Sequence, residues 1–141
     1  MVATGSDEEI LEFDTMVGVS GPFVGAPNPI RGIGGGGVPW RIDRGRGELG
    51  TDGRLEVNVE GLVLVVTGTN PQPAFRAAVS CLTTSGGMVV TVNRITGAFP
   101  ATSTGDATIE ATVDLPSPCV APIIFVGTGS GTFRWFAVTG F

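Results

Sequence analysis

The chain has 141 residues, enough for one domain with its own core, and carries a net charge of −5. It contains no histidine, lysine or tyrosine, which excludes Ser–His and Cys–His nucleophiles, Schiff-base lysines and imidazole metal ligands within the chain. The negative charge disfavours nucleic acid and anionic membrane surfaces as partners.

Glycine and proline punctuate the whole chain, with 23 and 10 residues respectively. In a chain that is 42% hydrophobic and only 15% charged, this punctuation predicts a packed fold of short strands joined by turns. No apolar run approaches the roughly 18 residues that a membrane-spanning helix needs, so no membrane span is expected.

The first predicted strand covers residues 9–19, where Leu11, Phe13 and Val17 occupy alternate positions. Residues 1–8 are predicted to be an N-terminal extension. Residues 20–38 are rich in glycine and proline and predict a long loop without secondary structure of its own, a kind of loop that is often functional.

A hairpin is predicted around Asp52–Gly53, because this dipeptide favours a tight turn between two strands. The strand before it covers residues 40–49. The strand after it covers residues 55–66, and its last five residues are apolar on both faces, which predicts a central strand covered on both sides.

The second half of the chain continues with further short strands, of which the first two are joined by a turn at Ser85–Gly87. The expected strands cover residues 75–81, 88–95, 106–115, 123–126 and 133–138. About eight strands without a helical period predict an all-β fold in a single domain of residues 9–141. Its architecture is an antiparallel β-sandwich, jelly-roll or Ig-like, or a small β-barrel.

The two cysteines, Cys81 and Cys119, are predicted to form a disulfide across 38 residues of sequence. The chain-entropy argument gives such a bridge about 4 kcal/mol of stability. The alternative is two buried free thiols. A disulfide favours an exported protein, so we expect an extracellular or cell-surface location, with the signal peptide absent from this sequence.

A glycine pattern in the long loop, Gly32, Gly34 and Gly37, matches the spacing of a dinucleotide-binding motif. That motif works only between a strand and the start of a helix, and neither is expected here. The pattern therefore indicates a turning connection, with backbone capture of an anion as the residual alternative.

The densest positive charge comprises Arg41, Arg44 and Arg46, with Arg31 upstream and Trp40 adjacent. Such a group could bind a carboxylated or carbohydrate ligand through bidentate hydrogen bonds. The competing interpretation is a solvated strand face, whose arginines pair with Glu56 or Glu60 across the hairpin.

Carboxylates on single strand faces suggest another possible function besides ligand binding, that of a carboxylate-dependent hydrolase. The candidate pairs are Glu12 with Asp14, and Glu110 with Asp114 and Asp106. Alternating strands place polar residues at the same positions for purely structural reasons. The same acids could bind calcium, but no calcium-loop motif is present, and no metal or cofactor is expected.

The C-terminal strand, with Phe133, Trp135 and Phe141, is predicted to be apolar and to lie at a sheet edge, where it could pair with another chain. A third alternative is a small outer-membrane β-barrel. We expect a non-enzymatic, exported structural or self-assembly domain that forms a homo-oligomer through this strand and the loop of residues 20–38.

Overall fold

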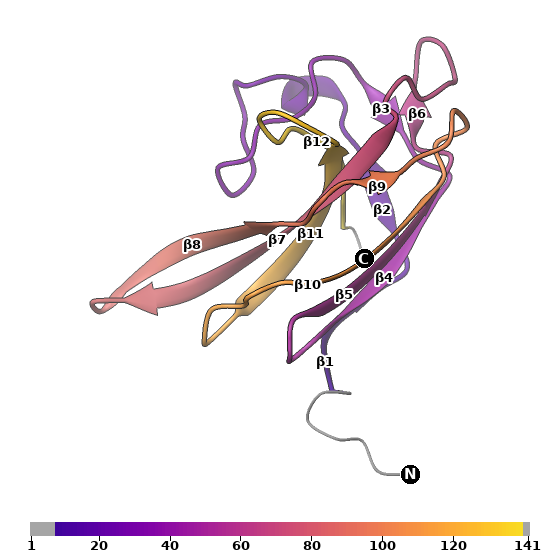
Figure 1. Ribbon diagram of the computed structural model, residues 1–141. Helices are drawn as coiled ribbons and strands as arrows, with labels where there is room; N and C mark the ends of the chain where they lie inside the picture. The colour runs from indigo at the N-terminus through magenta and orange to yellow at the C-terminus, as the bar shows by residue number, and fades with distance from the viewer. Residues whose placement is uncertain (1–7, 140–141) are drawn as a thin grey trace.

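Residues 8–139 are described by the computed structural model, and they form an all-β, antiparallel fold as predicted (Figure 1). The predicted extension, apart from residue 8, and Phe141 lie outside the described residues. The strands are β1 (Glu9–Phe13), β2 (Met16–Gly18), β3 (Trp40–Arg41), β4 (Arg44–Gly50), β5 (Arg54–Glu60), β6 (Val63–Leu64), β7 (Ala74–Ser85), β8 (Met88–Ile95), β9 (Phe99–Pro100), β10 (Ala107–Thr112), β11 (Val120–Thr128) and β12 (Trp135–Thr139). No helix in the described part of the chain is long and apolar enough to cross a bilayer.

Two sheets make up most of the molecule. The four-stranded sheet has the order β1-β4-β5-β10, and the six-stranded sheet has the order β2-β12-β11-β7-β8 with β9 attached to β7. The short strands β3 and β6 pair with each other. The two large sheets face each other in Figure 1, as in a sandwich.

The core lies between the two sheets and follows from the period-two pattern of the strands. Leu49, Val57 and Ile109 from the four-stranded sheet are fully buried, as are Phe75 and Ile124 from the six-stranded sheet. The intervening residues of β5 and β10 point to solvent. Alternation thus identifies the core face of these strands correctly.

The first predicted strand, residues 9–19, is wrong as a single element. The chain forms β1 in the four-stranded sheet, bends after Phe13, and forms β2 in the six-stranded sheet. Burial does not alternate through the bend: Asp14 and Thr15 are both exposed, and in β2 Met16 is buried whereas Val17 is 56% exposed. The sequence pattern therefore missed the change of sheet and placed Val17 on the wrong face.

Two other predicted strands are also split. Residues 40–49 form β3 and β4, and the predicted central strand of residues 55–66 ends as β5 at Glu60. Gly61 has a φ of +68°, and β6 then pairs with β3 instead of continuing the four-stranded sheet. Val65 and Val66 are exposed, so the end of this apolar run is not a covered strand.

The long loop of residues 20–38 contains a short 3₁₀ turn at Gly21–Phe23 and a bridge between Ile30 and Ile33, which corrects the expectation of no regular structure. It lies over the face of the six-stranded sheet that points away from the four-stranded sheet. The N–H of Gly36 donates to the carbonyl of Trp135, the N–H of Trp135 donates to the carbonyl of Gly34, and the side chain of Ile33 is buried.

Candidate functional site

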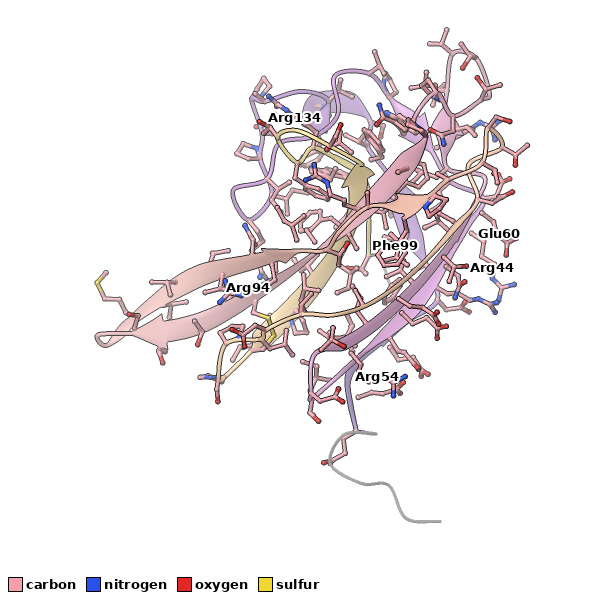
Figure 2. The ribbon with its side chains drawn as sticks, viewed as in Figure 1. Arg44, Arg54, Glu60, Arg94, Phe99 and Arg134 are labelled. Atoms are coloured by element: carbon pink, nitrogen blue, oxygen red, sulfur yellow. A yellow bond between two sulfur atoms is a disulfide. The ribbon has the colours of Figure 1, made fainter. Side chains whose placement is uncertain are left out.

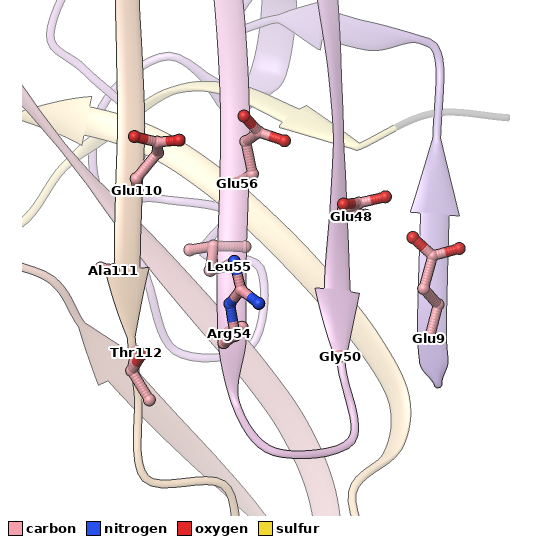
Figure 3. A pocket seen from close by; sticks show the side chains of 9 residues that line it. All are labelled: Glu9, Glu48, Gly50, Arg54, Leu55, Glu56, Glu110, Ala111 and Thr112. Carbon is pink, nitrogen blue, oxygen red and sulfur yellow. The ribbon is translucent and has the colours of Figure 1, made fainter. Parts of the chain in front are cut away.

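Four glutamates form a line straight across the outer face of the four-stranded sheet. Glu12 lies opposite Glu48, Glu48 opposite Glu56, and Glu56 opposite Glu110. We call these four residues the glutamate row; Figure 3 shows three of them on neighbouring strands. Directly opposed side chains in a sheet have Cβ atoms about 5 Å apart, so each pair of neighbours in the row repels.

Glu9 joins one end of the glutamate row, since its carboxylate lies within 4.8 Å of those of Glu12 and Glu48. Figure 3 shows Glu9 on β1 beside Glu48. A hydrogen bond with Glu48 raises the pKa of Glu9 to about 7, and the negative charges of Glu48 and Glu12 act in the same direction. Two carboxylates so close together share a proton more readily than they both ionise.

The glutamate row is not neutralised by ion pairs in the described part of the chain. Arg54 lies beside it and lines the same shallow hollow as Glu48, Glu56 and Glu110 (Figure 3). The ion pairs of residues 8–139 lie elsewhere and none includes a member of the row. The row itself is therefore a line of unpaired negative charge, on a sheet face that also presents Arg44, Arg46 and Arg54.

Three carboxylates at the end of this surface are close enough to share a cation. Oxygen atoms of Glu9, Glu12 and Glu48 lie within 4.8 Å of one another, and carboxylate oxygens are the ligands that calcium prefers. All three side chains are exposed. Exposed carboxylates often cluster without a metal, so this geometry alone does not assign a metal site.

The two groups of carboxylates considered for hydrolysis lie at opposite edges of the four-stranded sheet. Glu12 and Glu110 occupy opposite ends of the glutamate row, three strand spacings or about 14 Å apart. Asp14 lies beyond the end of β1, where its Oδ1 is 3.7 Å from the guanidinium of Arg44. Glu12 and Asp14 line one hollow together with two further members of the glutamate row, so their pairing for hydrolysis stays a prediction.

Asp106 and Asp114 flank β10. The hydroxyl of Thr104 and the backbone N–H of Gly61 donate hydrogen bonds to Asp106, and they lower the pKa of its carboxyl. The backbone carbonyl of Asp114 accepts a bond of 2.7 Å from Arg94. Asp106 therefore links the turn at Gly61, between β5 and β6, to the turn that contains Thr104, before β10.

The four arginines belong to three segments, with Arg31 in the long loop, Arg41 on β3 and the other two on β4, and their aromatic neighbour is buried. Trp40 is only 4% exposed and stacks on Phe136 with ring centroids 3.9 Å apart, so its faces are not open to a sugar ring. The guanidinium of Arg41 lies 3.5 Å from Asp43.

Arg44 and Arg46 do lie on one face of β4, as predicted. Arg44 is in register with Glu60, and Figure 2 shows the two on neighbouring strands, while its ion pair is with Asp14. Arg46 lies opposite Asn58. Both arginines are solvent-exposed.

Arg31 acts as an anchor for the long loop. Its guanidinium donates to the backbone carbonyls of Ser80 and Ala121, and its own carbonyl accepts from the side chain of Asn93. Burial lowers the pKa of Arg31. The nearby glycine pattern leads into β3 and not into a helix, as expected of a turning connection.

The predicted disulfide is present. Cys81 of β7, which is 1% exposed, is bonded to Cys119, which immediately precedes β11. The bond joins sequence positions 38 residues apart. It therefore fixes the segment before β11 against the middle of the long strand β7.

The C-terminal strand does not lie at a sheet edge. β12 is paired on both sides, with β2 and with β11, and Phe133 and Trp135 are buried. The prediction of an exposed assembly strand here is therefore wrong. An apolar strand is compatible with an edge and with an interior position, and the return of β2 to the six-stranded sheet decides between them.

The exposed apolar strand is β8. The hairpin of β7 and β8 extends away from the rest of the molecule (Figure 1), and residues 84–91 are all exposed. We call residues 84–91 the hairpin arm. It contains Met88, Val89 and Val90, which are 71%, 69% and 36% exposed, and it contains no charged residue. Sequence reasoning identified the hairpin but not its exposure, although the uncharged run Met88–Val92 was a usable signal.

Comparison with known proteins gives no relative: no family model, no curated protein and no solved structure matches this chain.

Proposed function

We propose that this protein is an exported, non-enzymatic assembly domain whose hairpin arm binds a second copy of the same chain. The observation that carries the proposal is the arm itself. Eight consecutive residues project from the body, and they expose three large apolar side chains without a charge between them. Exposed apolar surface of this kind marks interaction sites.

Charge distribution supports a second copy as the partner. Two chains of net charge −5 repel each other, most strongly where their acidic faces meet. The glutamate row lies on the four-stranded sheet, whereas the hairpin arm belongs to the six-stranded sheet. Contact through the arms joins two copies through their neutral, apolar segments.

An extracellular or cell-surface location is part of the proposal, and the disulfide between Cys81 and Cys119 supports it. Disulfides persist in oxidising compartments and are rare in the cytosol.

Sedimentation velocity of the full chain over a range of concentrations tests the proposal. We expect a species heavier than the 14.4 kDa monomer, populated increasingly as concentration rises. Val89→Lys adds a charge to the arm and should shift the protein to monomer. The matched control Val66→Lys adds the same charge at another exposed valine, outside the arm, and should leave assembly unchanged. A monomer at every concentration contradicts the proposal, as does equal loss of assembly in both variants.

A further inference from the structure

The sheet edges differ greatly in their ability to pair with another strand. Edge strands carry unpaired backbone groups, and proteins block them with charges, bulges, short length or a covering segment. In the four-stranded sheet, the edge strand β1 has two glutamates and an irregular register between Glu9 and Leu11. The other edge strand, β10, has Glu110 near its centre.

The six-stranded sheet has one blocked edge and one open edge. The edge strand β2 has three residues, and the chain following it is covered because the carbonyl of Val19 accepts a hydrogen bond from Trp40. The other edge strand, β8, has eight residues, pairs with β7 without interruption, and carries its only charge at Arg94, at the base of the hairpin arm (Figure 2).

The turn between β7 and β8 determines which backbone groups of β8 face outward. Gly86 and Gly87 have φ values of +59° and +80°, and Ser85 pairs with Met88 across this two-residue loop. In such a hairpin the closing pair is hydrogen-bonded, and every second pair after it along the two strands is hydrogen-bonded as well. Met88 and Val90 therefore direct their N–H and C=O groups toward β7, whereas Val89 and Thr91 direct theirs away from it.

A hydrogen bond at the other end of β8 supports this alternation. The N–H of Thr96 donates to the carbonyl of Ala77. Thr96 lies an even number of residues from Met88 and Val90, so the uninterrupted register directs the backbone groups of all three toward β7. Near Asn93 the long loop approaches, since the carbonyl of Arg31 accepts from the Asn93 side chain. The freely accessible part of the edge is thus Met88 to Val92.

From these observations we propose that two copies join edge to edge, with β8 antiparallel to β8 around a two-fold axis at Val90. This inference rests on the proposed function and specifies its interface. Val90 then lies opposite Val90 of the second copy. Val89 lies opposite Thr91 of that copy, and Met88 lies opposite its Val92. Because Val89 and Thr91 both present outward backbone groups, each such pair exchanges two hydrogen bonds.

The side chains fit this arrangement as well as the backbone. Met88, Val90 and Val92 share one face of β8, so the two-fold axis doubles them into a continuous apolar strip. Arg94 lies opposite the glycine turn of the other copy, so no like charges meet. Within residues 8–139, β8 is the one open edge of the two large sheets, and pairing through it closes on itself and yields a dimer, not a fibre.

Amide hydrogen exchange of the full chain, at concentrations below and above assembly, tests the inference residue by residue. The amides of Val89 and Thr91 should slow by at least about tenfold on assembly. The amides of Met88 and Val90 are already bonded to β7 and should change little. A dimer with unchanged exchange at Val89 and Thr91 overturns edge pairing and leaves assembly intact; a monomer throughout overturns both.

A pair of proline variants gives an independent test. Thr91→Pro removes an outward N–H of β8 and should weaken dimerisation at least about tenfold. Thr84→Pro is the matched control, because Thr84 lies opposite Val89 on β7 and its N–H faces the other side of the hairpin. Dimerisation that survives Thr91→Pro, with the hairpin still folded by circular dichroism, contradicts the inference. Loss in both variants contradicts it equally.

Discussion

The outer face of the four-stranded sheet and the hairpin arm are both exposed to solvent, but they differ in the side chains that they present. The sheet face concentrates acidic side chains in the glutamate row, where they repel one another and any second copy of the face. The arm carries no charge and exposes apolar side chains on an open edge. The sheet face is therefore stable in contact with water, whereas the hairpin arm is suited to bind another strand.

This contrast shows that net charge says little about where a chain can associate. A total of −5 suggests a self-repelling molecule, but the acids are unevenly placed. They protect β1 and β10 and leave β8 unprotected, so the position of each acid relative to an edge matters more than the sum.

The largest effect is expected from removing the disulfide at the base of the arm. Replacing both Cys81 and Cys119 with alanine should lower the free energy of unfolding by about 2 to 5 kcal/mol, measured by urea denaturation. Hydrogen exchange should accelerate first in β7 and β8 and later in β4 and β5, which the bond does not cross-link. Equal acceleration in both sheets would show that the arm has no independent stability.

How much of this contrast the sequence predicts depends on the kind of feature. Alternation identifies most strands and their core face, because it depends only on residues that are close in the sequence. The two cysteines identify the disulfide, because each has only one possible partner. Sheet order is different. The chain bend after Phe13 and the position of β12 depend on which strands meet, and a local pattern carries no such information.

The glutamate row illustrates the same limit at one turn. The hairpin at Asp52–Gly53 was predicted, but the loop comprises residues 51–53, with Gly53 at a φ of +88°. A two-residue loop would place Glu48 opposite Val57, whereas the three-residue loop places it opposite Glu56. One residue of loop length therefore decides whether the row exists.

A smaller effect is expected within the glutamate row. Glu56→Gln removes the charge that lies between Glu48 and Glu110, and it should raise the free energy of unfolding at pH 8 by about 0.5 kcal/mol. Adding 1 M salt should abolish this gain, because exposed charges are then screened. The control Glu60→Gln removes a charge opposite Arg44 and should give no gain. A loss of stability in Glu56→Gln would mean that the row is held by contacts other than repulsion.

The subtlest test concerns the proton at the end of the row. Folding raises the pKa of Glu9 from 4.5 to about 7, mainly through its hydrogen bond with Glu48, so the folded chain holds this proton more tightly than the unfolded chain. The resulting stability is complete below pH 4.5 and is lost as the pH rises through about 7. Urea denaturation between pH 4.5 and pH 8 should show this decline, and Glu9→Gln should flatten it. Glu8→Gln, at the neighbouring exposed residue, should retain the decline. If both variants follow the wild-type curve, the pH dependence comes from other groups, and the glutamate row acts on stability through charge repulsion alone.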